Sequence, residues 1–337
     1  MPSCSYANAP DSSWNFCPSL PADYLFCALF ITTTVVHVIQ AIVHRKLYSI
    51  VVIIAAAWQA VAFIFRAIAI HKPYSDGPYT IYFILILTGP LWINAYVYMV
   101  MGRMVYNFIP DKRLCKIKAW RFGLLFVLLD ITAFLVQLGG AAIASGNDSS
   151  PNTILLGLHI YMGGIGIQQL FILLFTFLAI KFHLQLLHQP PSPHRSRGLL
   201  LLYTLYAVLL LITIRIIFRL IEYSSGLDSS IPNHEAYMYI LDSAPMVIAL
   251  VLFNIVHPGR IMKGKEADFP SRKERKRLGR LMKEGNLGGA RGDEELGVVG
   301  GYEQVEGVSP MPSPMPKQTT GLVAEEGYVG AGYRGRV

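Results

Sequence analysis

Long runs of apolar residues, separated by short polar connections, make up most of the 337-residue chain. A run of about twenty apolar residues is long enough for a helix to cross the hydrocarbon core of a bilayer. Such a segment must be helical, because lipid offers the backbone no hydrogen-bond partners. The pattern therefore predicts an all-α polytopic membrane protein with seven transmembrane helices. The predicted spans cover residues 24–43, 48–70, 79–101, 119–144, 154–180, 198–221 and 236–256.

Composition and charge agree with this class and predict an orientation. Only 15% of the residues are charged, whereas about a quarter of the residues in soluble proteins are charged. The connections after the first, third and fifth spans and the C-terminal region together hold twenty-four Lys and Arg residues, and the opposite side holds Lys72 alone. Because positively charged loops stay in the cytosol, we expect the N-terminus outside and the C-terminus in the cytosol.

Residues 1–23 are expected to form an extracellular N-terminal segment. This segment has no basic start and contains four prolines, so it does not resemble a cleaved signal peptide. In an oxidising compartment, a disulfide between Cys4 and Cys17 is expected. Asn147 begins the sequon Asn-Asp-Ser in the predicted outer loop 145–153. It is a candidate glycosylation site, although such a tripeptide also occurs by chance.

The chain changes character after His257. Residues 258–337 are rich in Gly, Glu and Pro, and this composition predicts a disordered cytosolic tail. The first part of the tail, residues 260–283, is strongly basic and follows the last span directly. It is suited to bind anionic lipids of the inner leaflet. The alternative is that these charges only fix the orientation.

Six charged residues are candidates for positions inside the bilayer. A charge at the centre of a bilayer costs about 2.5–3.5 kcal/mol on insertion scales, so it rarely persists without a partner or a function. The signs are balanced, and this balance favours pairing between helices over a voltage sensor or an anion pore. The residues are Arg66, Asp130, Arg215, Arg219, Glu222 and Asp242.

The sixth and seventh spans carry most of these charges. Arg215, Arg219 and Glu222 follow the spacing i, i+4, i+7 and share one helix face, so Arg219 and Glu222 can pair locally. Arg215 lies six residues inside the end of its span, and Asp242 lies six residues inside the start of the next. Both are therefore ~9 Å deep at 1.5 Å per residue. We predict that Arg215 pairs with Asp242.

Arg66 lies near the same outer edge and is predicted to join this cluster through Glu222 or Glu235. Two interpretations are compatible with such a cluster. It can be a structural clasp that holds the second, sixth and seventh spans together. It can also be a polar vestibule that binds a lipid head group or changes its pairing during transport.

Asp130 lies near the middle of the fourth span, with Gln137 two turns further along. Asn94 on the third span and Gln168 on the fifth have comparable predicted depths. A lone carboxyl at this depth can stay protonated and form hydrogen bonds with these amides. Alternatively, it lines the path of a substrate and takes part in proton coupling.

Glycines and prolines predict how some of these spans pack. Small residues allow transmembrane helices to approach closely, and the fourth and fifth spans contain Gly139, Gly140, Gly157, Gly163, Gly164 and Gly166. Pro90 and Pro245 are expected to bend the third and seventh spans. A bend at each proline would free backbone carbonyls near Asn94 and Asp242.

Several blocks of sequence resemble the fungal lipid-translocating exporter family, the RTA-like seven-span proteins linked to 7-aminocholesterol resistance and release of sphingoid long-chain bases. The resemblance covers about residues 20–260. It depends on "AYVYMVMGR" (95–103), "DITAFLVQLGG" (130–140), "GGIGIQQLFILLF" (163–175), "RIIFRLIEYSSG" (215–226), "HEAYMYILD" (234–242) and "HPG" (257–259).

The resemblance implies a function and carries the family pattern onto polar residues of these blocks. These are Arg103, Asp130, Gln137, Gln168, Arg215, Arg219, Glu222, Glu235, Tyr239, Asp242 and His257-Pro258-Gly259. One departure is that the second span usually reads Glu, Gly-Tyr, Arg in this family, whereas Gln59, Ala62 and Phe63 precede Arg66 here. The implied function is translocation or release of amphipathic lipids, with resistance to lipid-like toxins. The implied location is the plasma membrane, with the vacuole or endoplasmic reticulum as alternatives.

Other classes of function fit the sequence less well. No GxxxxGK[ST] motif is present, so ATP is not expected to be the direct energy source, and we expect no catalysis, cofactor or nucleic acid. A seven-span signalling receptor has the same topology, but no acid precedes Arg103 and no Asn-Pro-x-x-Tyr ends the seventh span. An intramembrane zinc hydrolase needs histidines at one depth, whereas His37, His159 and His257 are predicted at different depths.

Overall fold

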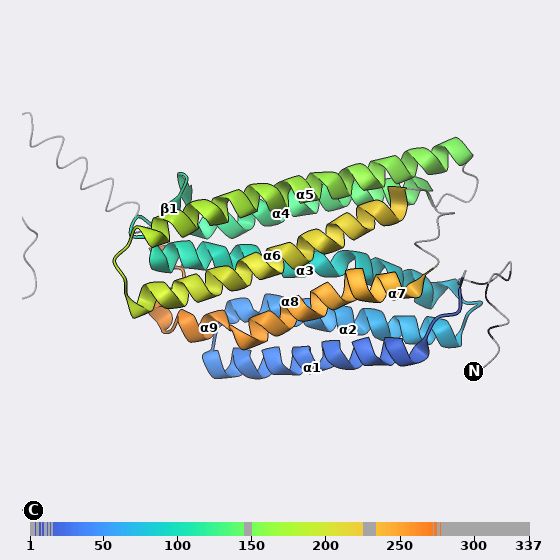
Figure 1. The fold of residues 1–337 in the computed structure, drawn as a ribbon, viewed down its shortest axis with the longest axis horizontal. Coiled ribbons are helices and arrows are strands. Elements are labelled where there is room, and N and C mark those ends of the chain that lie inside the picture. The colour runs from blue at the N-terminus through green and yellow to red at the C-terminus, as the bar shows by residue number, and fades with distance from the viewer. Residues whose placement is uncertain are drawn as a thin grey trace, which may run out of the picture. The chain divides into compact units, whose positions relative to one another are not determined.

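The predicted seven-helix fold is confirmed in the computed structural model of the chain. The structure describes residues 4, 7, 9, 12, 14, 16–144, 150–224, 234–271, 273, 274 and 277. In these residues, seven helices are long and apolar enough to cross a membrane, and Figure 1 shows them side by side. The predicted ranges fall within these seven helical spans.

Most of the helices extend beyond the predicted ranges. The first six spans are α1 (Leu20–His44), α2 (Ile50–His71), α3 (Asp76–Phe108), α4 (Ala119–Ala144), α5 (Pro151–Leu187) and α6 (Pro193–Ser224). A 3₁₀ turn, η1 (Leu47–Ser49), precedes α2. The seventh span is composite and consists of α7 (Glu235–Tyr237), η2 (Met238–Ser243) and α8 (Ala244–Ile255).

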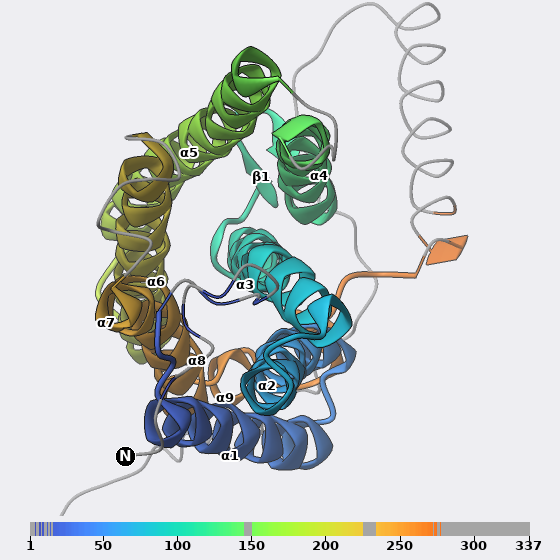
Figure 2. The ribbon, with the colours of Figure 1, turned by 90° about the vertical axis from the view of Figure 1, so that its right-hand side faces the viewer.

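The helices form a ring in which each contacts the next in sequence. Contacts between α1 and α8 close the ring, and α3 also contacts α5 and α6, as the end-on view in Figure 2 illustrates. The helices α1, α3, α5 and α7 begin at one end, which we call the N-terminal end. The opposite end carries a two-stranded hairpin, β1 (Arg113–Leu114) and β2 (Ile117–Lys118), and the short helix α9 (Pro258–Ile261).

Three of the predicted glycines bring α4 and α5 into close contact. A Cβ atom on Gly140 would lie 2.3 Å from the backbone nitrogen of Tyr161 and 2.7 Å from the carbonyl oxygen of Gly157. A Cβ atom on Gly164 would lie 3.0 Å from the carbonyl oxygen of Ala133. The other three, Gly139, Gly163 and Gly166, have open space beside them. Half of the predicted set therefore accounts for the close approach.

The seventh span contains a π-helical segment directly before Pro245. Residues Met238–Ser243 form η2, and the backbone N–H of Ala244 donates to the carbonyl of Tyr239, five residues earlier. Proline has no N–H, and in an α-helix its ring clashes with the carbonyl four residues before it. The wider π-helical turn relieves this clash locally. The predicted distortion at Pro245 thus takes the form of a π-helix, a rare element that often marks functional sites.

The chain remains ordered beyond residue 258, where the sequence predicted the start of a disordered tail. The Nζ atom of Lys46 donates to the carbonyl of Gly264 at 2.6 Å and to Asp268 at 3.0 Å. Phe269 packs edge-on against Tyr106, with ring centroids 5.4 Å apart. The segment is polar and short of apolar residues, which explains the wrong prediction for 258–271. Residue 272 and most of 275–337 lie outside the described residues, and for them disorder stays a prediction.

The glycine contact predicts unequal effects of the same substitution at two positions. We expect Gly140→Ala to lower the free energy of unfolding by about 1–3 kcal/mol, because overpacking forces the two backbones apart. The matched control Gly163→Ala should change this free energy by less than about 1 kcal/mol, because its methyl group meets no atom and alanine favours a helix. Thermal unfolding in detergent measures both, and equal effects would contradict this account of the interface.

Candidate functional site

The first cluster joins the sixth and seventh spans near the N-terminal end. Arg215 forms the predicted ion pair with Asp242. Arg219 donates to the other oxygen of Asp242 at 2.5 Å and to Glu222 at 2.9 Å. All four side chains are buried. Two guanidinium groups therefore face two carboxylates, and this cluster is neutral as a unit.

Pro90 gives Arg215 a second partner. Because proline has no N–H, it leaves the carbonyl of Ile86, four residues earlier, without its helical partner. Arg215 donates to this carbonyl at 3.1 Å. The sequence predicted that Pro90 would free a carbonyl near Asn94, and the freed carbonyl instead serves the arginine of α6. This contact ties α3 to the first cluster.

The second cluster surrounds Arg66 and is separate from the first. Arg66 donates to Glu235 at 2.7 Å and to Asp23 at 3.2 Å. It also donates to the hydroxyl of Tyr239 at 2.7 Å. Of the two predicted partners, only Glu235 is used, because Glu222 is engaged by Arg219. One guanidinium group thus faces two carboxylates.

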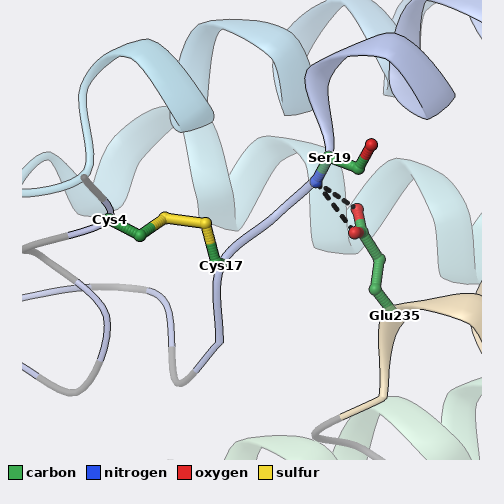
Figure 3. Close-up of a disulfide and its surroundings, with 4 residues drawn as sticks. All are labelled: Cys4, Cys17, Ser19 and Glu235. Carbon is green, nitrogen blue, oxygen red and sulfur yellow. Dashed lines mark hydrogen bonds between the residues drawn. A yellow bond between two sulfur atoms is a disulfide. The ribbon is translucent and has the colours of Figure 1, made fainter. Parts of the chain in front are cut away.

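The N-terminal segment is tied to this second cluster. Trp14 is buried, donates to the carbonyl of Ala69 at 3.2 Å and lies with its ring centroid 5.2 Å from the Arg66 guanidinium. Glu235 accepts from the backbone N–H of Ser19 at 2.8 Å, as Figure 3 shows. Cys4 and Cys17 form a disulfide. The described part of this segment therefore packs on the C-terminal end of α2 and the start of α7.

Two of the predicted amides lie beside the arginines and not beside Asp130. Gln137 donates to Gln168 at 3.0 Å. These two side chains and those of Arg215 and Arg219 line a small cavity. The volume of this cavity is about 20 Å³. A buried water needs roughly 10–15 Å³ and several polar partners, so the cavity is suited to hold one. Helical depth alone could not predict which neighbouring helix each amide faces.

Asp130 has a different environment from the other buried acids. One oxygen, Oδ2, accepts from Asn94 at 2.8 Å and from Tyr98 at 3.0 Å. The other, Oδ1, is buried and has no hydrogen-bond partner among the described residues. No ion pair between Asp130 and a described cation is present. The carboxyl is thus held in position on one side only.

An apolar groove passes over Asp130 between α2, α3 and α4. Its volume is about 320 Å³. The residues that line it are Trp58, Thr88, Leu91, Trp92, Ala95, Val127, Asp130, Ile131 and Phe134. Apart from the carboxyl and the Thr88 hydroxyl, the lining is hydrocarbon and aromatic. A ligand with an apolar chain and a small polar head would match this surface.

Three residues of these clusters, Asp23, Trp14 and Tyr98, were not predicted from the sequence. Asp23 was assigned to the extracellular segment, whereas it is fully buried in the first turn of α1. Its position near a helix start was a signal, since acidic residues favour that turn. Nothing in the local pattern indicated Trp14 or Tyr98. Asn147 lies outside the described residues, so its glycosylation stays a prediction.

Arg103 and His257, to which the family resemblance drew attention, lie at the opposite end of the bundle. Arg103 lies between two aromatic rings, 4.0 Å from the Tyr48 centroid and 4.9 Å from that of Phe269. His257 is buried and stacks on His44 with ring centroids 4.8 Å apart. Within the described residues, no group of three or more His, Cys, Asp or Glu side chains is placed to hold a metal ion.

Comparisons with known proteins identify the family. Residues 52–265, more than half of the chain, match the family described as "RTA1 like protein". The chain belongs to the RTA1-like family. The resemblance seen in the sequence blocks is therefore confirmed, and the protein is an integral membrane protein. No solved structure matches this RTA1-like protein.

Curated relatives of this RTA1-like protein include several named transporters. It is 44% identical over 275 residues to the probable lipid transporter atnI of Emericella nidulans, a match over 76% of this chain and 70% of that protein. It is 29% identical to protoporphyrin uptake protein 1 of Saccharomyces cerevisiae, over 58% of this chain and 64% of that protein. It is 22% identical to the sphingoid long-chain base transporter RSB1 of the same species, over 78% of each.

The first cluster predicts a large effect of removing its shared acid. We expect Asp242→Asn to lower the free energy of unfolding by about 3–5 kcal/mol, because two buried guanidinium groups lose their common carboxylate. Removing one cation as well, in Asp242→Asn with Arg215→Gln, should recover part of this loss.

The exposed Asp111→Asn serves as the matched control and should have no effect. Thermal or denaturant unfolding of the purified protein in detergent measures all three variants. A loss for Asp242→Asn no larger than that of the control would show that the cluster is not a stabilising unit.

Proposed function

We propose that this protein translocates amphipathic lipids across its membrane, in particular sphingoid long-chain bases or similar compounds with a cationic head, and thereby gives resistance to lipid-like toxins. Membership of the RTA1-like family and relatives named as lipid and long-chain base transporters support the class of substrate. The proposed partners are membrane lipids and the lipid substrate itself. The proposed location is the plasma membrane, with the N-terminal end outside.

The observation that carries this proposal is the unpartnered oxygen of Asp130 beneath the apolar groove. A carboxylate that is buried without a cation is costly, so this position favours a ligand that brings positive charge. A protonated amine supplies both the charge and the hydrogen-bond donors that Oδ1 lacks. The apolar chain of such a lipid would lie along the groove lined by Trp58, Trp92 and Phe134.

Asp242 is a weaker candidate for the same role. Both of its oxygens are engaged by guanidinium groups, one from Arg215 and one from Arg219. An incoming amine would have to displace an arginine that is itself buried, which leaves an unpaired cation. The first cluster is therefore better suited to hold the helices together, and Asp130 is better suited to receive the substrate.

The basic region that follows the last span has a separate proposed role. Residues 260–283 are rich in Lys and Arg, and such a segment next to a membrane attracts anionic lipids at about 1 kcal/mol per basic residue. We place this region on the cytosolic leaflet. This role concerns anchoring and orientation, and it is independent of the path that the substrate takes.

Replacing the proposed amine acceptor should slow translocation strongly. We expect Asp130→Asn to reduce the rate for a fluorescent long-chain base in proteoliposomes about tenfold or more, because a hydrogen bond to a charged group contributes about 1.5–3 kcal/mol. The exposed Asp111→Asn, the same chemical change outside the groove, should keep the wild-type rate. An N-acylated analogue, which lacks the cationic amine, should be insensitive to Asp130→Asn.

Two outcomes would contradict the proposed function. One is a wild-type protein that moves the long-chain base at the rate of protein-free liposomes. The other is an Asp130→Asn variant that matches wild type for the cationic lipid. In the second case, translocation would stand and the assignment of Asp130 would fall.

A further inference from the structure

Arg66 is shared by two carboxylates that do not compete equally for it. Glu235 lies 2.7 Å from the guanidinium, and its other oxygen accepts from the backbone N–H of Ser19 at 2.8 Å. Asp23 lies 3.2 Å away, and its Oδ2 atom is buried without a hydrogen-bond partner among the described residues. Glu235 is thus well satisfied as an anion, and Asp23 is not.

Charge counting around this cluster leaves one negative charge in excess. Arg66 and Asp23 are both fully buried, and the Glu235 side chain is 13% exposed. A single buried guanidinium can neutralise one buried carboxylate. When two carboxylates share such a site, one of them strongly favours its neutral form. The unpartnered Oδ2 atom indicates which of the two carries the proton.

We propose that Asp23 is a proton-binding site of this protein and that its proton is exchanged during translocation. In the conformation described here, the proton is on Asp23 Oδ2 and Arg66 pairs chiefly with Glu235. When the proton leaves to water, Asp23 becomes negatively charged and competes with Glu235 for the guanidinium group of Arg66. The contact between α1, α2 and α7 then changes, because these three helices meet at Arg66.

Among the described residues, Arg66 is the one cation that forms an ion pair with Asp23. Asp23 is close enough to interact electrostatically with Arg66 and His71 on α2, Glu235 on α7, Tyr239 on η2 and Cys27 on its own helix. The His71 ring nitrogen Nδ1 is hydrogen-bonded to the carbonyl of Ala67. Tyr239 interacts with Arg66 through its hydroxyl. A proton therefore remains the simplest cation for Asp23.

This inference rests on the proposed translocation only for the exchange step, and the proton site itself can be tested without it. In infrared spectra of the full-length protein at neutral pH, the carboxylic acid C=O signal should fall by one group in Asp23→Asn. It should also fall by one group in Glu235→Gln, because Arg66 then pairs with Asp23 alone and keeps it ionised. The exposed Asp111→Asn should leave the signal unchanged.

A signal that survives in both Asp23→Asn and Glu235→Gln would overturn the proton site, whether or not the protein moves lipids. A loss in Asp23→Asn but not in Glu235→Gln would show that Glu235 does not control the proton, and would equally reject the shared-arginine mechanism. Size-exclusion profiles that match wild type show that these variants are folded.

The exchange step is tested with the same variants in proteoliposomes. For wild type, a pH gradient should change the rate of long-chain base translocation relative to the rate without a gradient. In Asp23→Asn, the translocation that remains should proceed at the same rate with and without the gradient. A wild-type rate that ignores the gradient would overturn proton exchange while leaving translocation intact, whereas no translocation at all would overturn the proposed function instead.

Discussion

Neutralising three buried arginines is the constraint on which the arrangement of this bundle depends. A guanidinium group keeps its charge under all physiological conditions, so each one that leaves water needs an anion from a neighbouring helix. Arg66 on α2 takes carboxylates from α1 and α7, and Arg215 and Arg219 on α6 share a carboxylate from η2. The seventh span must therefore lie between the first two helices and the sixth. Closure of the ring follows from this requirement.

The backbone is adapted to the same charges at two prolines. Pro245 is preceded by the π-helical segment that carries Asp242, and Pro90 leaves the carbonyl that Arg215 uses. In both cases the residue that interrupts a helix lies within one or two turns of an ion pair. At Pro90, the Ile86 carbonyl, which would be unsatisfied in lipid, thus becomes part of the polar network. The distortion of these helices at proline is therefore linked to the burial of charged side chains nearby.

The sequence predicted the seven helices and the Arg215–Asp242 ion pair but not the division of polar residues between clusters. Helix length and equal depth were sufficient for Arg215 and Asp242, because adjacent antiparallel helices leave few other partners. Depth does not specify which way a side chain faces, so Gln137 and Gln168 were grouped with Asp130 although they lie beside the arginines. Asp23 was missed because a residue at a predicted boundary can be solvated or buried. The docked segment 258–271 was missed because the few apolar residues that anchor it, among them Met262, Ala267 and Phe269, are scattered through a polar stretch.

The two interpretations of the charged residues, a clasp and a substrate site, belong to different residues of the same bundle. Glu222, Glu235 and Asp242 are paired with arginines, hold helices together and have little capacity left for a ligand. Asp130 and Asp23 each keep one buried oxygen without a partner among the described residues. These two acids lie on α4 and α1, outside the first cluster. Asp130 forms no ion pair with a described cation, so its carboxyl is separate from the interactions that keep the fold, whereas Asp23 also takes part in them through Arg66.

A residue of the second span also affects how charge is distributed around Asp130. The resemblance implied a glutamate there, whereas this chain has Gln59. Gln59 is buried and packs so closely against Gly89 that a Cβ atom on this glycine would lie 2.5 Å from the Gln59 amide. Trp58 and Thr88, the direct neighbours of these two residues in sequence, line the groove over Asp130. Among the described residues that line this groove, Asp130 is the one carboxylate. Gln59 carries no negative charge beside the groove, so in the proposed function Asp130 is the group that attracts a cationic lipid.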